Sequence, residues 1–214
     1  MTDERLPVAN LYPDPPLLDR WLNVPGHLCR KERWKLHDLA LDHVRTACLE
    51  IGSWLGAGLG CLLSGTRGTE AKVFSIDLYN EDALQRQMLT LEAYDVDSTR
   101  LIRYDGPSQE IGKHWAIPLD LVFIDGSHEP EDLRQDLDLF APHVGLEGVM
   151  ILHDSRMPDE DEIADRVNRL YNLRRLSAQL RPAIEGWLVD QMGAWCELEP
   201  CHSMRVFRRK VLPQ

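Results

Sequence analysis

The chain has 214 residues, of which 43% are apolar, and a formal net charge of -11. A chain of this length and apolar content fits one large domain with a single sizeable core better than two small domains. Clustered Lys and Arg supply most of the affinity for a phosphate backbone, so the acidic balance argues against a nucleic-acid partner.

The N-terminus carries no recognisable targeting segment. Its first twenty residues contain acids and four prolines, and they lack the apolar region of roughly 7–15 residues that marks a signal peptide. No apolar run approaches the ~20 residues that span a bilayer. We therefore expect a soluble, cytoplasmic protein with no membrane partner. The five cysteines form no zinc-type pattern and are expected to be free thiols.

Apolar runs alternate with helical patterns along the chain, with Gly, Pro and Ser breakers between them. In chain order we expect a helix at 31–41, a strand at 47–51, a short helix ending at 63, a strand at 73–76, a helix at 83–93, strands at 101–103 and 119–124, a helix starting at Pro130, a strand at 149–152 and a helix at 163–173 after the acidic turn 159–162. The stretch from Trp187 to Val211 contains two strand-like pieces without an intervening helix, which predicts an antiparallel hairpin.

Five successive strand–helix units predict a parallel, doubly wound sheet with helices on both faces. With the hairpin, the expected fold is a mostly parallel, seven-stranded α/β sheet. Residues 1–45 would form a Pro-rich and helical cap segment on a Rossmann-like core at 46–214, within a single domain. The Pro-rich segment could also pack on a neighbouring subunit in a homo-oligomer.

The stretch CLEIGSWLGAGLG, residues 48–60, places four glycines directly after the first strand. Ligands of doubly wound sheets bind at the carboxyl ends of the strands, where this loop lies. A phosphate-binding loop needs GxxxxGK(S/T), and the only Gly-Lys pair is followed by His114. A GxGxxG fingerprint fails as well, because its last position falls on Cys61 or Leu63.

The spacing that does fit is an acid, one residue, a glycine, three residues and a second glycine. Glu50, Gly52 and Gly56 stand in this pattern, which resembles the first motif of class I S-adenosylmethionine-dependent methyltransferases. The two glycines would let the backbone approach an adenosyl group that has no phosphates, and the acid would orient the loop or the cationic methionyl end. Ser53 and Trp54 lie inside the loop and are further cofactor-binding candidates.

Trp54 could instead pack under the N-terminal segment. Gly58 and Gly60 remain outside the motif, and close packing of the following helix against a strand is the only role we expect for them.

Two later loops supply further candidates for cofactor contacts. Asp77 follows the second strand, where one carboxylate would accept both hydroxyls of a ribose; the alternative is a simple helix N-cap. Asp105 and Ser108 follow the third strand, at the loop that borders the adenine in class I enzymes. We expect them to bond the edge of the adenine.

A second set of motifs lies downstream. Residues 124–128 read IDGSH after the fourth strand, and His153-Asp154 follows the fifth. Together with EIGSWLG, these motifs resemble the methyltransferase family that includes macrocin and rhamnosyl O-methyltransferases and the cephalosporin hydroxylase-type proteins. The resemblance covers roughly residues 48–158 and implies a class I methyltransferase fold with S-adenosylmethionine as cofactor.

The same resemblance places the fourth and fifth strands side by side, so that Asp125 and Asp154 would converge on one cation. Mg²⁺ accepts one or two carboxylates and would lower the pKa of a bound hydroxyl. Ser155 stands where catechol-type enzymes have a stronger third ligand. His128 occupies the position of their lysine base, and it is either the general base or a structural residue. His153 is expected to be structural or to support the metal ligands.

Charge is unevenly distributed around this region. Thirteen acids stand against two arginines between Asp125 and Asp165. A solvated helix face with favourable dipole interactions accounts for much of this charge. An acidic rim would also disfavour anionic acceptors.

The resemblance implies an S-adenosylmethionine-dependent O-methyltransferase that acts on the hydroxyl of a small molecule, such as a natural product or a sugar, with Mg²⁺ as a possible assistant. Three alternatives stay open on the same fold: a cephalosporin hydroxylase-type protein, an N-methyltransferase, and a domain that binds the cofactor without turnover. The O-methyltransferase and the N-methyltransferase would both use S-adenosylmethionine as the methyl donor.

Overall fold

The computed structural model describes residues 17–158 and 167–211. Seven strands form one sheet in the order β3-β2-β1-β4-β5-β7-β6. Their bounds are β1 (Ala47–Ile51), β2 (Lys72–Asp77), β3 (Leu101–Asp105), β4 (Leu119–Ile124), β5 (Val144–Leu152), β6 (Trp195–Glu197) and β7 (Arg205–Arg209). β1 to β5 pair in parallel, and β7 pairs antiparallel with both β5 and β6. The predicted doubly wound sheet with an antiparallel C-terminal hairpin is confirmed.

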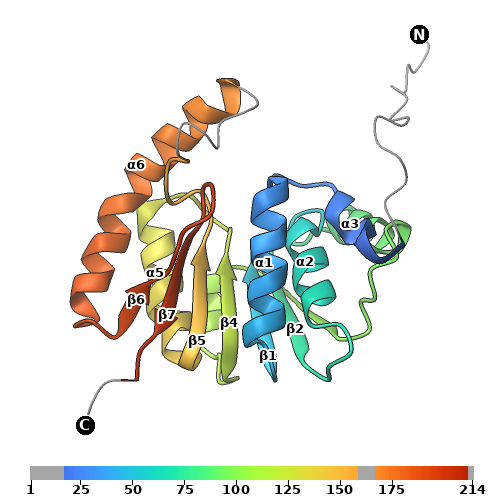
Figure 1. The fold of residues 1–214 in the computed structure, drawn as a ribbon, viewed down its shortest axis with the longest axis horizontal. Helices are drawn as coiled ribbons and strands as arrows, with labels where there is room; N and C mark the ends of the chain where they lie inside the picture. Colours follow the sequence, from blue (N-terminus) through green and yellow to red (C-terminus); the bar gives the residue numbers. More distant parts are fainter. Residues whose placement is uncertain (1–16, 159–166, 212–214) are drawn as a thin grey trace.

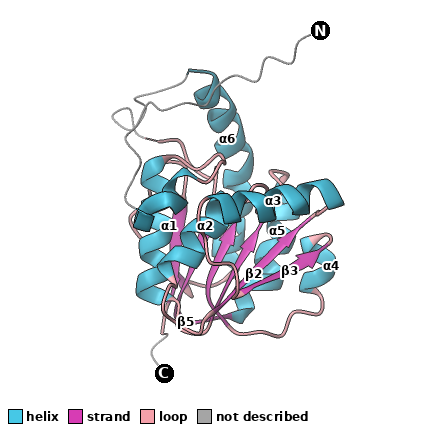
Figure 2. Ribbon diagram, turned by 90° about the vertical axis from the view of Figure 1, so that its right-hand side faces the viewer, coloured by secondary structure: helices cyan, strands magenta, loops and turns pink. Residues whose placement is uncertain are grey.

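Helices cover both faces of the sheet (Figures 1 and 2). Their bounds are α1 (Arg30–His43), α2 (Ala57–Gly65), α3 (Glu81–Ala93), α4 (Ser108–Gly112), α5 (Pro130–Phe140) and α6 (Val167–Asp190), with 3₁₀ turns η1 (Leu17–Asn23) and η2 (Ala141–His143). None of these described helices combines the length and the apolar run needed to cross a bilayer.

Alternate residues of each strand point to opposite faces, which divides the core into two clusters. Cys48 and Phe123 pack with Leu36 and Leu62 on the side of α1 and α2. On the other face, Leu49 packs with the buried residues of α5 and α6. All five cysteines are free thiols, as predicted.

The strand register determines where the site is built. Ile51 of β1 pairs with Ile76 of β2 and with Ile124 of β4, and Ile124 pairs with Leu152 of β5. The residues that follow these four therefore leave the sheet in one row. On one side of β1 the sheet continues with β2 and β3, and on the other side with β4 and β5. The row of residues therefore lies at the point where the strand order reverses.

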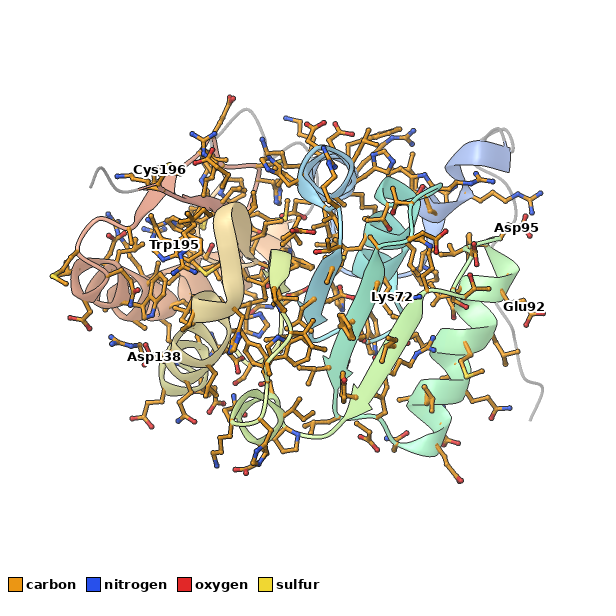
Figure 3. The ribbon with its side chains drawn as sticks, turned by 90° about the horizontal axis from the view of Figure 1, so that it is seen from below. Lys72, Glu92, Asp95, Asp138, Trp195 and Cys196 are labelled. Carbon is orange, nitrogen blue, oxygen red and sulfur yellow. The ribbon has the colours of Figure 1, made fainter. Side chains whose placement is uncertain are left out.

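The C-terminal part differs from the prediction in one respect. Trp187 belongs to α6, which continues to Asp190. Leu180, Ile184 and Trp187 repeat at helical spacing and are buried, so they extend the helix past Pro182. In the view from below, Trp195 of β6 and Asp138 of α5 lie at the left, on the same side of the molecule as α6 (Figure 3).

One strand boundary and one helix also differ from the prediction. β5 begins at Val144 rather than at 149, with an irregularity in its pairing between Leu119 and Leu121. The short helix α4 was not expected. The expected acidic turn at 159–162 lies outside the described residues.

Candidate active site

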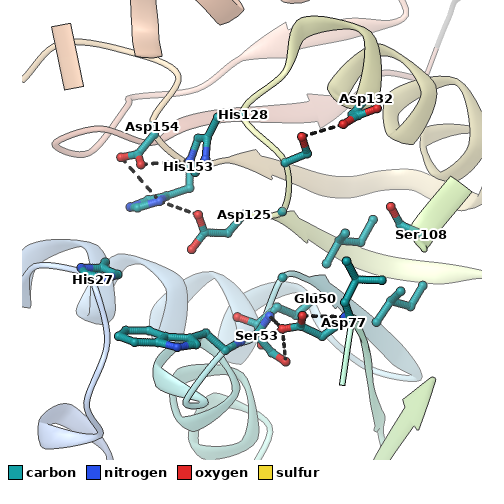
Figure 4. A pocket seen from close by; sticks show the side chains of 18 of the residues that line it. His27, Glu50, Ser53, Asp77, Ser108, Asp125, His128, Asp132, His153 and Asp154 are labelled. Atoms are coloured by element: carbon teal, nitrogen blue, oxygen red, sulfur yellow. Dashed lines mark hydrogen bonds and ion pairs between the residues drawn. The ribbon is translucent and has the colours of Figure 1, made fainter. Parts of the chain in front are cut away.

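A cavity of about 580 Å³ opens at the carboxyl ends of the central strands, within the usual range of small-molecule sites (Figure 4). Its wall is formed mainly by residues 26–28, 50–54, 76–78, 106–109, 125–128 and 153–154. The row of residues that follows the paired strand ends thus forms the floor of one pocket.

The glycine loop approaches the next strand connection very closely. Gly52 has φ +84°, and a Cβ there would lie 2.3 Å from the backbone oxygen of Asp125. Gly56 has φ +94° and precedes α2. Both residues of the motif therefore need the left-handed backbone that glycine adopts without strain.

Gly58 provides space for a buried carboxylate. A Cβ at Gly58 would lie 1.9 Å from Oε1 of Glu50, so this position of α2 must lack a side chain. Glu50 is only 1% exposed, and its Oε2 has no hydrogen-bond partner among the described residues. Burial raises the pKa of Glu50 well above its usual value, and the nearby Asp125 and Asp77 carboxylates add to this shift. Gly60, by contrast, lies against Val24 of the N-terminal segment.

Asp77 holds the glycine loop in place. Its Oδ2 accepts hydrogen bonds from the backbone N–H of Ser53 at 2.8 Å and of Trp54 at 2.7 Å. The alternative role as a helix N-cap is wrong, because Asn80 precedes α3 and its side chain accepts from the N–H of Ala83.

A buried polar network supports the same loop from behind. The side-chain amide of Gln87, on α3, donates to Oγ of Ser53 and to the carbonyl of Trp54, both at 2.9 Å. The hydroxyl of Tyr79 lies 2.6 Å from Oγ of Ser53 and from Oγ of Ser75. The sequence did not point to these supports, since none of them belongs to a motif.

Trp54 both lines the cavity and contacts the N-terminal segment. Its ring stacks on His27, with centroids 4.7 Å apart and an interplanar angle of 4°. The residue has φ +40°, unusual for a non-glycine, and is 53% exposed. The structure confirms the packing against the N-terminal segment, and contact of Trp54 with the cofactor stays a prediction.

Of the two adenine-edge candidates, the structure brings only Ser108 to the cavity. Ser108 lines the wall and donates to Oδ1 of Asp136 at 2.7 Å. Asp105 is exposed and lies outside the lining, because the chain turns at Gly106, which has φ +141°. Gln109 lines the wall instead.

At the other end of the cavity, Asp125, His128 and Asp154 converge. One ligand-type atom from each lies within 4.8 Å of the others. Nε2 of His128 lies 3.2 Å from Oδ2 of Asp154, and this hydrogen bond raises the pKa of His128 despite partial burial. The predicted meeting of the fourth and fifth strand ends thus brings all three side chains together.

His153 lies beneath this cluster. Its Nδ1 is 2.7 Å from Oδ1 of Asp125 and 3.6 Å from Oδ1 of Asp154. Its Nε2 lies 3.5 Å from Oε1 of Glu32, an ion-pair distance too long for a good hydrogen bond. Burial lowers the pKa of His153, but the carboxylates of Asp125 and Glu32 outweigh it and raise the pKa well above the usual value.

Glu32 was not predicted to take part. It is fully buried, and its carboxylate accepts from the backbone N–H of Cys29 at 2.7 Å and of Ser203 at 3.0 Å. Burial raises the pKa of Glu32, but the nearby His153 and hydrogen bonds from His202 and Ser203 outweigh it and hold the pKa well below the usual value. Ser203 is 171 positions away in the sequence, so only the fold reveals this contact.

A family model described as a methyltransferase domain matches residues 49–155, half of the 214 residues. The chain belongs to the class I S-adenosylmethionine-dependent methyltransferases. The match spans the glycine loop, the IDGSH motif and the His153-Asp154 pair.

Solved structures share the fold of this methyltransferase. SAH-bound PaMTH1 of Podospora anserina is 17% identical, with a TM-score of 0.68 over 91% of this chain and 88% of that one. An O-methyltransferase family protein of Burkholderia thailandensis is 13% identical, with a TM-score of 0.60 over 85% and 56%. MycE, a methyltransferase of the mycinamycin biosynthetic pathway, in complex with Mg, SAH and mycinamycin VI, is 17% identical, with a TM-score of 0.58 over 91% and 55%.

The cavity of the methyltransferase fits the chemistry of its cofactor. The unpaired, buried Oε2 of Glu50 is an acceptor that the ammonium group of S-adenosylmethionine would satisfy.

Proposed function

We propose that this methyltransferase transfers a methyl group to a hydroxyl of a small molecule, at the cluster of Asp125, His128 and Asp154. The observation that supports this proposal is the convergence of two carboxylates and an imidazole at one end of the cofactor-sized cavity. When bound, S-adenosylmethionine supplies an electrophilic methyl group on its sulfonium.

The cofactor would lie along the strand ends. We expect its methionyl part to lie along four residues of the glycine loop, Gly52, Ser53, Trp54 and Gly56. Glu50 would bind the cationic end. Asp77 has acceptor capacity beyond its loop hydrogen bonds and would receive the ribose hydroxyls. Ser108 and Gln109 would border the adenine; Gln109 takes the place expected for Asp105.

The cluster also suits a divalent cation. Asp125 and Asp154 offer oxygen ligands of the kind that Mg²⁺ prefers, and a bound cation would lower the pKa of the acceptor hydroxyl. Ser155 adds no ligand, because its Oγ donates to the carbonyl of Leu152 at 2.7 Å. Waters and the acceptor would have to complete the coordination.

His128 is positioned to act as the base. Nε2–H of His128 donates to Asp154, which orients the imidazole and leaves Nδ1 to receive the proton of the acceptor hydroxyl. Most of the acceleration would come from alignment of oxygen, carbon and sulfur, since good orientation lowers barriers by roughly 7–11 kcal/mol.

A metal-independent reaction is the second candidate. The pKa of His153 is raised by its carboxylate neighbours, which favours a positive charge close to both Asp125 and Asp154, where a cation would otherwise neutralise them. In that case the histidines and the alignment of the substrates would suffice.

Incubation with methyl-labelled S-adenosylmethionine and a panel of sugar, phenol and macrolide acceptors, with Mg²⁺ or with EDTA, tests the proposal. Label on an acceptor oxygen, lost in Asp125→Asn, is expected. Loss of transfer in EDTA and rescue by Mg²⁺ would support the cation, and full activity in EDTA would support the second candidate. Label only on nitrogen, or retained in full by Asp125→Asn, would contradict the proposal.

A further inference from the structure

A second cavity, of about 560 Å³, lies between α6, the segment after β5 and the C-terminal hairpin. Among the described residues, the charged ones in its lining are Arg156, Arg174, Arg181, Arg205, Glu185 and Glu197. Four arginines against two glutamates make this wall positive in a chain whose net charge is -11. Such a local reversal of charge attracts anions to the cavity.

Both glutamates pair with one arginine. Arg205 donates to the two carboxylate oxygens of Glu197, each at 2.8 Å, and to Glu185 at 2.9 Å. Its guanidinium also lies 5.0 Å from the ring of Phe207. Arg205 is buried and forms a fixed side of the cavity. Four arginines and two glutamates leave the described lining a net formal charge of +2.

Arg174 and Arg181 have no hydrogen bond or ion pair through their guanidinium groups with any residue that the structure describes. They stand seven residues apart on α6, which places them on one helix face about 10 Å apart. The small residues Ser177 and Ala178 line the cavity between them and leave space for a ligand. Planar guanidinium groups bind carboxylates and phosphates through paired hydrogen bonds.

We propose that this cavity binds a small molecule carrying a carboxylate or phosphate group, held between Arg174 and Arg181. The cavity begins at Ser155, the residue after Asp154 of the reaction cluster. The opposite flank of α6 contacts the cluster too, since the side-chain amide of Gln179 donates to the carbonyl of His128 at 3.3 Å. A ligand here is therefore either the acidic end of the acceptor or a separate small anion beside the active site.

This assignment runs against the expectation that the acidic rim disfavours anionic acceptors. The described acids of that window, from Asp125 to Asp154, do not line this cavity, whose helical wall is formed by α6. The two regions therefore offer opposite charge to a ligand.

Calorimetry with inorganic phosphate and with citrate, at about 0.15 M salt to limit non-specific attraction, tests the binding. Arg174→Gln combined with Arg181→Gln should weaken the affinity about tenfold or more. Arg175→Gln removes a neighbouring exposed arginine of α6 that does not line the cavity, and it should leave the affinity unchanged. Equal affinity in the wild type and the double variant, or an equal loss in Arg175→Gln, would overturn the proposal, as would no binding to the wild type.

A second arm identifies the source of the anion and rests on the proposed methyl transfer. Dihydroxybenzoate and dihydroxybenzene are compared as acceptors. A preference for the acid that disappears in the double variant assigns the cavity to the acceptor. Equal use of both, with phosphate still bound, assigns it to a separate anion. Absence of any methylation would count against the proposed function alone, because phosphate binding is measured without turnover.

Discussion

Nδ1 of His153 lies 2.7 Å from Oδ1 of Asp125, while Nε2 of the same ring lies 3.5 Å from Oε1 of the buried Glu32. One imidazole thus connects the start of α1 to the reaction cluster at the ends of β4 and β5. Ser203 and His202, next to the C-terminal hairpin, contact the same Glu32 carboxylate. Segments from both ends of the described chain therefore help to hold the cluster.

Glu32→Gln tests this connection. The change leaves a hydrogen-bonding side chain of similar shape but removes the charge that faces His153 and His202. Breaking a buried charged group's interactions is costly, so we expect the free energy of unfolding to fall by roughly 3 kcal/mol or more. Urea denaturation gives this value. Glu129→Gln, on an exposed glutamate, is the control; a similarly small change in both variants would contradict the buried role of Glu32.

The same contacts predict a pH dependence of stability. Hydrogen bonds to Cys29 and Glu32 raise the pKa of His202 to about 9. A raised pKa in the folded state means that this contribution is fully present below about pH 6.5 and is lost as the pH rises through 9. The lowered pKa of Glu32 has the opposite sign, so its contribution is present above about pH 4.3 and falls at lower pH.

Thermal unfolding between pH 5 and pH 10 measures the alkaline limb. His202→Gln should flatten the decline between about pH 6.5 and 9, whereas His114→Gln, on an exposed histidine, should not. An unchanged decline in His202→Gln would show that other groups cause it.

Gly58→Ala is expected to disturb the cofactor site through Glu50. The added Cβ would meet Oε1 of Glu50 at 1.9 Å and force the buried carboxylate to move. We expect the affinity for S-adenosylmethionine, measured by calorimetry, to fall about tenfold or more. Gly186→Ala is the matched helix control, because its Cβ would meet no atom within 4 Å. That control should stabilise the protein by up to about 1 kcal/mol; normal binding by Gly58→Ala would contradict the role of this contact.

Asp77→Ala should weaken the binding of S-adenosylmethionine, because it removes both the proposed ribose acceptor and the hydrogen bonds to the N–H groups of Ser53 and Trp54. A loss of about tenfold or more in calorimetry is expected. Asp105→Ala should bind normally, since Asp105 lies outside the cavity. Unchanged binding in the Asp77 variant would remove Asp77 from the cofactor site.

His128→Ala should depress turnover more than cofactor affinity. Loss of a general base typically costs about 10²–10⁴-fold in rate. We expect this loss in single-turnover methyl transfer, with the dissociation constant of S-adenosylmethionine within about twofold of the wild type. A parallel loss of rate and affinity would instead indicate that His128 holds the cofactor or the local structure.

Much of the fold was predictable from periodicity. β1 and β4 have the predicted bounds, because their short apolar runs are buried on both faces and end at a glycine or an aspartate. The parallel order then requires Asp125 and Asp154 to emerge at the same edge. Gly52 and Gly56 were recognised by their spacing, and their left-handed backbone supplies the physical reason.

The remaining features depend on contacts between distant segments. The need for glycine at position 58 follows from the rotamer of Glu50, which no local pattern specifies. In the sequence, Glu32 is an ordinary acidic residue in the first turn of a helix. Only the fold brings the C-terminal hairpin and His153 into contact with it. Asp105 has the right place in the sequence, but the turn at Gly106 directs the following residues into the cavity instead.

A crystal structure of the protein with S-adenosylhomocysteine and Mn²⁺, with anomalous data collected for the metal, tests the central claim most directly. We expect the cofactor along the ends of β1 and β2, with its sulfur toward Asp125 and His128, and an anomalous peak between Asp125 and Asp154. A cofactor whose sulfur faces away from this cluster would contradict the proposed reaction centre. A correctly placed cofactor without the anomalous peak would contradict the cation and leave His153 to neutralise the two aspartates.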